Sequence, residues 1–418
     1  MRGSKDEEIH MRHAKSLKEV KRILGNMAKQ NPTEGLSMID SIQRLGIEYH
    51  FEEEIEAVLQ RQQLMLGSRT YFGNIDHELS EVALRFRLLR QEGEAKLKHE
   101  FWGNIEGMAA SFEASQSSIE GEDRLDEAGK LSLQLLNAWV SRFHDHPKAK
   151  AIVNTLRCPT HKSLSKFMPT SLELQNSGWT SSLQELSKLD THIMSSLQLK
   201  EIFAVSKWWK ELGLAKDLKF ARDEPIKCYM WPVACLSGPH FSEERIELTK
   251  PLSLLYIIDD IFDVYGSIEE LTLFTDAVNR WNLEAMEQLP DYMKACYKAL
   301  YDITNEFALK WVKLCNAFLV EAKWFAWGHL PKAEDYLKNG IATTGVELVL
   351  LHTFFLMGDG INKETVSIMD GFPTLIYSTA TILRLHDDLE GIKCYMKEHP
   401  EVSAEETIQI MNEKISDA

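Results

Sequence analysis

Three aspartates lie in one strongly apolar stretch near the middle of the chain. The segment LSLLYIIDDIFDVYG, residues 252–266, carries Asp259, Asp260 and Asp263. On a helix, at about 100° per residue, Asp259 and Asp263 lie one turn apart on the same face and repel each other. Buried carboxylates are costly unless a proton or a cation neutralises them. Because the donors are hard oxygens without histidine or cysteine, the pattern predicts a Mg²⁺ site. A solvated acidic face is the alternative, which the apolar flanks disfavour.

A second acidic pair ends another apolar run. In TLIYSTATILRLHDDLE, Asp387 and Asp388 follow the run, and Arg384 stands three residues before Asp387 on nearly the same helical face. An arginine beside a metal-binding acidic pair would allow the arginine and the metal to bind the same anion. The alternative is a plain ion pair between the arginine and an aspartate. Arg222, in the segment FARDEP, is a further candidate for contacting an anion, or else an exposed loop arginine.

The composition excludes some classes of partner. With 63 acidic residues against 47 basic ones, the net charge is −16. We therefore expect no nucleic-acid partner, because phosphates need a basic face. The apolar runs are short and interrupted by charge, so we expect no membrane span. Six scattered cysteines have no metal-binding spacing and indicate reduced thiols of an intracellular protein.

Helical periodicity dominates the sequence. Segments such as EEEIEAVLQRQQLML and EAGKLSLQLLNAWVSRF repeat apolar residues at helical spacing, and alternating strand patterns are scarce. The predicted fold class is all-α. A chain of 418 residues favours two domains. A stretch rich in Ser, Pro, Asn and Gly suits a linker, so we predict an N-terminal domain over residues 1–175 and a C-terminal domain over 176–418 that carries the acidic clusters.

DDIFDVYG has the form of the DDxxD motif of plant class I terpene synthases. SKWWKELGLAKDLKFARD, EAKWFAWGHLPKAEDYLKNG and EASQSSIEGEDRLDEAG are also similar to sequences of that family, and the resemblance runs from residue 10 to the C-terminus. It implies an N-terminal α-barrel-like domain and a C-terminal class I α-bundle with the active site. It also implies an enzyme that uses Mg²⁺, with Mn²⁺ as a substitute, and acts on geranyl or farnesyl diphosphate. We expect a monomer in the cytoplasm or the plastid stroma.

The resemblance assigns roles to particular residues. Arg222 and Arg384 match positions that contact diphosphate. Clustered metal ions and arginines stabilise the negative charge that develops on a leaving diphosphate. The aspartates that match or adjoin the two metal motifs, DDxxD and (N/D)Dxx(S/T)xxxE, are Asp259, Asp260, Asp263, Asp387 and Asp388.

The organic fragment becomes a carbocation, which needs a dry pocket of apolar and aromatic groups. A ring face stabilises a cation by about 0.5–2 kcal/mol. Trp231, Tyr256 and Tyr377 are candidates for this contact, with core packing as the alternative for each. The segment Thr343–Gly345 resembles the kinked helix that family members place near the reacting carbons.

The second metal motif is incomplete. Its Ser/Thr position is Gly391 and its Glu position is Tyr395, because two segments that relatives separate by a polar stretch are joined here at 390–391. A similar junction falls at 93–94, and relatives continue beyond EKISDA through further helices. Two explanations stay open: residues are missing from the sequence at these points, or the protein is shortened and binds its metals poorly. The second explanation adds weight to the alternative that the chain is a helical family member without catalytic activity.

Other departures bear on the product. Glu224 stands where many relatives have the second arginine of an RxR element, which weakens the diphosphate contact there. The DxDD acid motif is absent, so protonation-initiated cyclisation is not expected. A paired-arginine motif followed by tryptophan is also absent, as in the subgroup that makes linalool or nerolidol. We therefore predict an acyclic alcohol, formed when water captures the allylic cation. A cyclic monoterpene or sesquiterpene synthase is the alternative.

Overall fold

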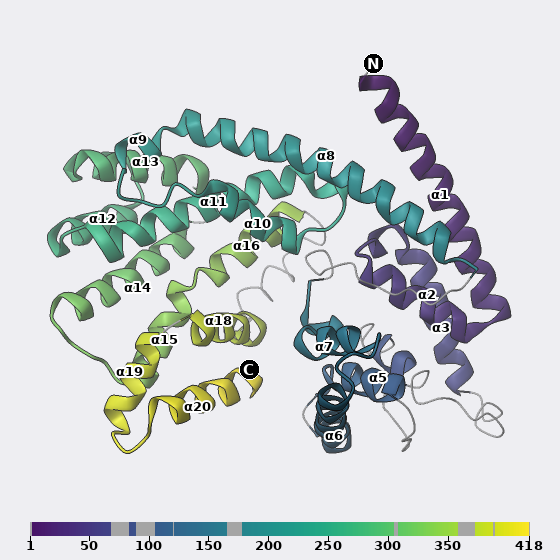
Figure 1. The fold of residues 1–418 in the computed structure, drawn as a ribbon. Helices are drawn as coiled ribbons and strands as arrows, with labels where there is room; N and C mark the ends of the chain where they lie inside the picture. The colour runs from purple at the N-terminus through teal and green to yellow at the C-terminus, as the bar shows by residue number, and fades with distance from the viewer. Residues whose placement is uncertain are drawn as a thin grey trace. The chain divides into compact units, whose positions relative to one another are not determined.

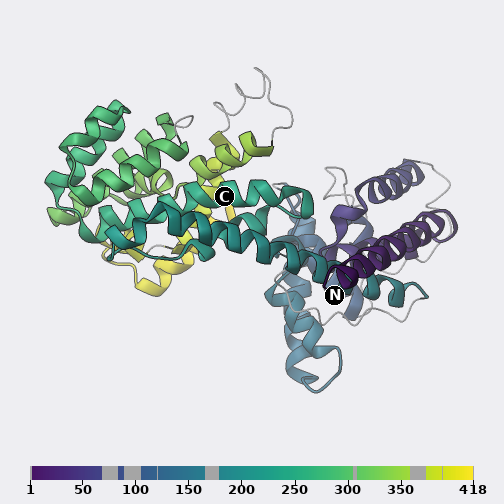
Figure 2. The ribbon, with the colours of Figure 1, turned by 90° about the horizontal axis from the view of Figure 1, so that it is seen from above.

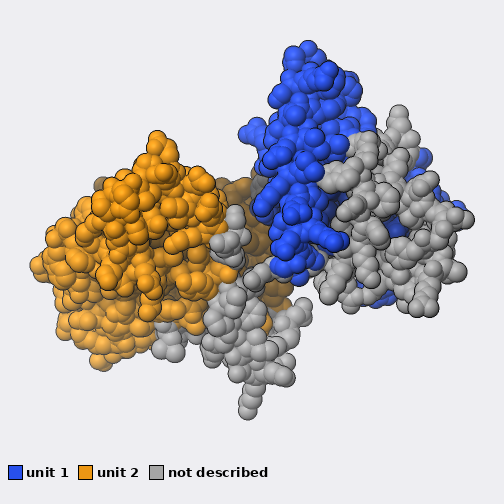
Figure 3. Space-filling model, turned by 90° about the horizontal axis from the view of Figure 1, so that it is seen from below, with its two compact units in different colours: residues 1–196 blue, residues 197–418 orange. Residues whose placement is uncertain are grey.

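The computed structural model describes residues 2–67, 83–88, 105–119, 121–164, 178–304, 308–357, 373–387 and 389–417. Over these residues the chain forms helices and no strand, which confirms the all-α prediction (Figure 1). The chain divides into two compact units, residues 1–196 and 197–418 (Figure 3). The division falls within one long helix, Thr180–Leu212. The domain boundary that we predict after residue 175 lies outside the described residues, shortly before this helix begins.

The N-terminal unit has one main apolar core, formed by its first helices and the start of the long helix. Leu24, Ile39, Phe51 and Leu183 are all fully buried there. The helices of this unit include α1 (Arg2–Gln30), α2 (Pro32–Arg44), η1 (Glu48–His50), α3 (Glu52–Gly67), α5 (Ile105–Ser115), α6 (Asp123–Arg142), α7 (Ala149–Arg157), η2 (Thr160–Lys162) and the first part of α8 (Thr180–Leu212). Residues 83–88 are helical as well.

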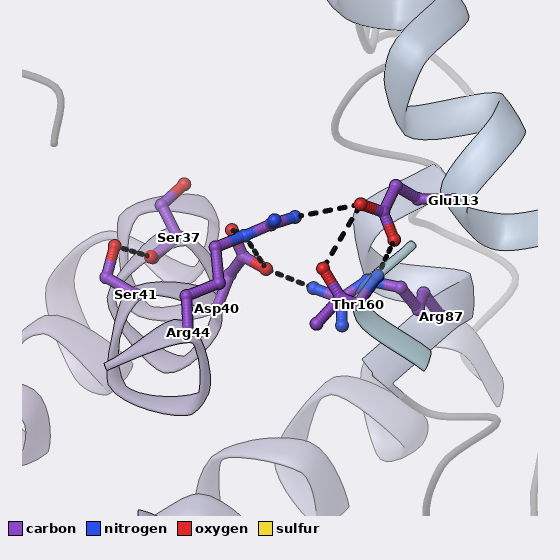
Figure 4. A network of polar contacts seen from close by, with 7 residues as sticks. All are labelled: Ser37, Asp40, Ser41, Arg44, Arg87, Glu113 and Thr160. Carbon is purple, nitrogen blue, oxygen red and sulfur yellow. Dashed lines mark hydrogen bonds and ion pairs between the residues drawn. The ribbon is translucent and has the colours of Figure 1, made fainter. Parts of the chain in front are cut away.

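A network of ion pairs joins separate elements of this unit (Figure 4). Asp40 on α2 pairs with Arg44, 2.9 Å away, and with the buried Arg87. Glu113 on α5 accepts hydrogen bonds from the backbone N–H and the hydroxyl of Thr160 at 2.9 and 3.1 Å. Burial opposes ionisation of Asp40, but the two guanidinium groups hold the pKa of this carboxyl below its usual range.

In the C-terminal unit, the helices gather around α11, whose second half, LSLLYII, is almost entirely apolar and requires burial on several sides (Figures 1 and 2). Ile257, Ile258 and Phe274 are at most 1% exposed. After the end of α8 the elements are α9 (Leu214–Asp217), α10 (Pro225–Cys235), η4 (Pro239–Phe241), α11 (Ser242–Asp260), the π-helical turn η5 (Ile261–Tyr265), α12 (Ile268–Arg280), η6 (Leu283–Gln288), α13 (Asp291–Thr304), α14 (Ala308–Ala326), α15 (Ala333–Thr343), α16 (Val346–Met357), α18 (Pro373–Asp387), α19 (Leu389–Glu398) and α20 (Ala404–Asp417).

A buried ion pair fixes α8 to α11. The side chains of Arg245 and Glu201 are each 1% exposed and form two hydrogen bonds, of 2.9 and 2.6 Å. The remaining Nη1 of Arg245 donates to the carbonyls of Leu236 and Gly238 at 3.0 and 2.7 Å. The Tyr229 hydroxyl also donates to Glu201. Because these partners satisfy the charged groups, the pair is tolerated in the core.

One stretch of the described chain, Ala333–Met357, is long and apolar enough to cross a membrane by length and composition, whereas we expected no run of this kind. It is broken into α15 and α16 at Gly345, which has φ +70°. A β-carbon at Gly345 would lie 2.6 Å from Cδ2 of Leu255 on α11, so the position requires glycine for its backbone and for its packing. This break confirms the kink predicted at Thr343–Gly345.

Candidate active site

The end of α11 positions the first acidic cluster. Asp259 and Asp260 lie in its last turn, and Asp263 lies in the π-helical turn η5 that follows. The N–H of Gly266 donates to the carbonyl of Ile261 at 2.8 Å, a spacing of five residues instead of four. Turns of this kind occur frequently at functional sites. Asp260 is buried, Asp259 is half-buried, and Asp263 is exposed at the rim.

Arg222, a candidate for contacting diphosphate, pairs with the first cluster. Its backbone N–H donates to Oδ2 of Asp260 at 2.6 Å, and its Nε lies 2.8 Å from Oδ1 of the same residue. Its Nη2 lies 2.5 Å from Oδ2 of Asp259. The guanidinium carbon lies 4.7 Å from the centre of the Tyr256 ring, so this aromatic side chain supports the arginine.

The acids of this cluster remain incompletely neutralised. Partial burial, together with the charges of Asp259 and Glu321, raises the pKa of Asp263 to about 7. Burial also raises the pKa of Asp259 even though Arg222 acts in the opposite direction. Burial therefore disfavours the charged form of these carboxylates unless a proton or a cation neutralises them.

A second set of polar groups comes from α14, α15 and α18. Nη2 of Arg384 donates to Oε1 of Glu321 at 3.1 Å and to the Tyr336 hydroxyl at 3.0 Å. The Thr343 hydroxyl donates to the same Oε1 at 3.0 Å. A β-carbon at Gly340 would lie 2.6 Å from Nε of Arg384, so the glycine makes room for the arginine.

Both sets of polar groups face one cavity of about 990 Å³. Asp259 and Asp263 line it from α11 and η5, and Arg384 lines it from α18. Polar groups on a largely apolar wall are typical of small-molecule sites. The apolar lining includes Phe262, Leu271, Phe318, Ala322, Trp324 and Phe325. The structure thus places the first acidic cluster and the helix of the second acidic pair around the same space.

Other predicted residues lie elsewhere. Trp231 on α10 and Tyr377 on α18 are 47% and 53% exposed and do not line this cavity. Their contact with a carbocation stays a prediction. Asp387 is the last residue of α18, but its side chain, like the whole of Asp388, lies outside the described residues.

The remaining positions of the second motif belong to a different helix. Since α18 ends at Asp387 and α19 begins at Leu389, Gly391 and Tyr395 do not continue the face that carries Arg384. The ring of Tyr395 packs against that of His399 at 4.5 Å, and a β-carbon at Gly391 would lie 3.6 Å from the Tyr336 ring. These two positions supply packing and no carboxylate. Helix α19 runs unbroken through 390–391, whereas 93–94 lies outside the described residues.

Glu321 is a site residue that the sequence reasoning missed. It lies on α14, and its carboxylate faces the cavity beside Arg384. An acid inside the apolar segment NAFLVEAKWFAW was the available signal. Oε1 of Glu321 accepts hydrogen bonds from Arg384 and Thr343, so its charge is paired and it positions the arginine at the cavity. Of the described carboxylates that line the cavity, those of Asp259 and Asp263 are therefore left to hold Mg²⁺.

Both parts of the chain match a known protein family. The family described as "Terpene synthase family, metal binding domain" matches residues 210–418, and "Terpene synthase, N-terminal domain" matches residues 2–156. A neryl diphosphate diphosphatase of Glycine max, named chloroplastic, is 48% identical over 96% of this chain and 84% of its own length. An (E)-nerolidol synthase of Cannabis sativa is 44% identical over 92% of this chain and 79% of its own.

The fold also matches a solved structure. Isoprene synthase from grey poplar, crystallised with three Mg²⁺ ions and dimethylallyl-S-thiolodiphosphate, has a TM-score of 0.86. The match covers 97% of this chain and 86% of that one, at 29% identity. The alignment with the diphosphatase is 448 positions long although this chain has 418 residues, so that relative contains residues that this chain lacks.

Proposed function

Because this chain belongs to the terpene synthase family, we propose that it converts geranyl or farnesyl diphosphate to an acyclic alcohol of the linalool or nerolidol type, with release of diphosphate. The observation that carries the proposal is the cavity that Asp259, Asp263 and Glu321 share with Arg384. Carboxylates for a cation and an arginine for an anion meet there beside an apolar wall. That combination suits a substrate with a charged head and a hydrocarbon tail.

Different side chains would assist different parts of the ionisation step. Mg²⁺ held by Asp259 and Asp263, with Asp260, Asp387 and Asp388 as further candidate ligands, would neutralise charge on the leaving diphosphate. Arg222 and Arg384 would donate hydrogen bonds to diphosphate oxygens, which strengthen as the allylic C–O bond breaks and its electron pair leaves with the diphosphate. The apolar lining limits water around the carbocation. One water then forms the new C–O bond and loses a proton, which yields the alcohol.

A relative supplies a second candidate substrate. By its name, the diphosphatase from Glycine max acts on neryl diphosphate. Neryl diphosphate is the isomer of geranyl diphosphate with the opposite configuration at one double bond. Water capture in the same cavity would give the corresponding alcohol. The name of that relative also supports the plastid over the cytoplasm as the location of this protein, which imaging of a fluorescent fusion would check. We keep the monomer as the proposed state, to be measured by sedimentation.

The test is incubation with geranyl, farnesyl and neryl diphosphates, with Mg²⁺, with Mn²⁺ and without metal. Gas chromatography identifies the organic product, and a phosphate assay measures the diphosphate released. We expect an acyclic alcohol that forms only with metal, and no turnover by Asp259→Ala. Asp276→Ala is the matched control, because Asp276 is exposed on α12 and does not line the cavity.

Each other result selects a different function. Cyclic products would identify a cyclising synthase with the same ligands. Turnover by Asp259→Ala equal to that of the unaltered chain would refute the metal assignment. A folded protein that converts none of the three substrates at any metal concentration would identify a non-catalytic member of the family. The incomplete second motif at Gly391 and Tyr395 is the feature that favours that outcome.

A further inference from the structure

A cluster of two histidines and one aspartate lies in the N-terminal unit. His13 comes from α1, His50 ends η1, and Asp190 lies on α8. Nε2 of His50 lies 2.8 Å from Oδ1 of Asp190, and Nε2 of His13 lies 3.3 Å from the same oxygen. One candidate ligand atom from each residue falls within 4.8 Å of the others. Three elements distant in sequence therefore bring three donor atoms to one point.

The two imidazoles converge on this point without stacking. Their ring centres are 5.1 Å apart and the ring planes are tilted by 55°. The side chains of His13, His50 and Asp190 are 13%, 15% and 8% exposed. Nε2 of His13 is buried, and in the described part of the chain its contact with Oδ1 of Asp190 at 3.3 Å does not have the geometry of a hydrogen bond. A buried polar atom without a partner is costly, and coordination to a metal ion would satisfy this nitrogen.

A further side chain orients the aspartate. The Tyr49 hydroxyl donates to Oδ2 of Asp190 at 2.6 Å, which leaves Oδ1 facing the histidines. Metal ligands are commonly held in this way by a hydrogen bond from behind. Burial and the neighbouring His50 lower the pKa of His13, which favours the neutral imidazole. Burial opposes ionisation of Asp190, but hydrogen bonds from His50 and Tyr49 keep the pKa of this carboxyl below its usual range.

We propose that His13, His50 and Asp190 bind one divalent transition-metal ion of the Zn²⁺ class. Two imidazoles and a carboxylate with one open position are a usual zinc ligand set. Bonds of about 2.0–2.1 Å in a tetrahedral site separate the ligand atoms by about 3.3 Å. The observed separations from Oδ1 of Asp190, 2.8 Å to His50 and 3.3 Å to His13, are close to that value. Imidazole donors select zinc over Mg²⁺. The ion would connect α1, η1 and α8 and so stabilise the N-terminal unit.

Titration of the full chain with Zn²⁺, in excess Mg²⁺ to occupy the carboxylate site, tests the proposal. We expect one equivalent of Zn²⁺ to bind and to raise the melting temperature of the N-terminal unit. His13→Ala and Asp190→Asn should abolish stoichiometric binding. Tyr49→Phe should weaken it by roughly 10–100-fold. His192→Ala is the matched control, because His192 is exposed on α8 two residues from Asp190, and it should bind as the unaltered chain does.

A second measurement removes any dependence on variants that fail to fold. X-ray absorption of the Zn²⁺-loaded unaltered chain should show nitrogen and oxygen ligands at about 2.0–2.1 Å with the scattering of two imidazoles. Sulfur at about 2.3 Å would assign the ion to cysteines and overturn the proposal. Absence of stoichiometric Zn²⁺ binding by the unaltered chain, or binding that persists in a folded His13→Ala variant, would overturn it as well.

Discussion

Replacing Gly345 by alanine should destabilise the C-terminal unit by about 2–5 kcal/mol. The residue has φ +70°, and a side chain in that conformation costs about 1–2 kcal/mol. The added β-carbon would also lie 2.6 Å from Cδ2 of the buried Leu255, and crowding in a packed core costs about 1–3 kcal/mol. Leu255 precedes Asp259 by one helical turn, so the strain falls on the helix that carries the acids.

Two other glycines separate these contributions. Gly213 has φ +78°, but a β-carbon added there would meet nothing within 4 Å, so Gly213→Ala should show the backbone cost alone. Gly25 lies in α1 with no positive φ and nothing within 4 Å, so Gly25→Ala should stabilise its helix by about 0.5–1 kcal/mol. Urea denaturation followed by circular dichroism gives the three free-energy differences.

A double-mutant cycle decides whether the contact with Leu255 is responsible. Leu255→Ala alone should cost about 2–5 kcal/mol as a core truncation. Because it also makes space for the new methyl group, the double variant should be less destabilised than the sum of the two single variants, by about 1–3 kcal/mol. Additive effects, or a Gly345→Ala cost equal to that of Gly213→Ala, would show that the crowding argument is wrong.

Three further predictions follow from charged groups. Arg245→Met should lower the free energy of unfolding by about 3–5 kcal/mol, because it leaves the Glu201 carboxylate buried without its partner. Urea denaturation should show that adding Glu201→Leu recovers part of this free energy. A free energy of unfolding for Arg245→Met equal to that of the unaltered chain within error would contradict this. Without metal, the pKa of Asp263, raised to about 7, means that the folded state retains a proton which the unfolded state releases above about pH 4. Stability should therefore fall as pH rises from about 4 to 7, and melting curves of Asp263→Asn should show a smaller fall; an identical pH profile would refute the assignment. Asp40→Asn should lower the free energy of unfolding by about 3–5 kcal/mol, because the Arg87 guanidinium stays buried without its charged partner. The lowered pKa of Asp40 contributes stability that is lost as pH falls, so the variant should also make the melting temperature of the N-terminal unit less sensitive to acid. The same dependence of melting temperature on acidic pH in the variant and the unaltered chain would contradict this.

The first acidic cluster was predictable because local sequence determines it. The apolar flanks of Asp259 and Asp263 require that α11 be buried, so the carboxylates at its end must face a cavity or a counter-charge. The kink at Gly345 was predictable for a similar reason, since two β-branched residues before a glycine are unfavourable within a helix. The π-helical turn was not, because its apolar pattern differs little from that of an α-helix.

Residues that act through tertiary contacts were harder to predict. Glu321 reaches Arg384 across 63 positions of sequence, and His50 reaches Asp190 across 140. No periodicity within one segment reports such pairs. The aromatic candidates were hard to predict for the same reason. Trp231 and Tyr377 lie on helices, as expected, but both side chains are largely exposed, because the neighbouring helices decide which face of a helix is buried.

Helix α8 has a practical consequence for dividing the chain into fragments. It is one continuous helix, Thr180–Leu212, although the two compact units meet at residues 196 and 197. A fragment starting at residue 197 would begin in mid-helix with four backbone N–H groups unpaired, one turn before the buried Glu201. A fragment starting at 178 keeps the helix whole but removes Leu183 from the other core. Neither half can be excised without cost to one of them.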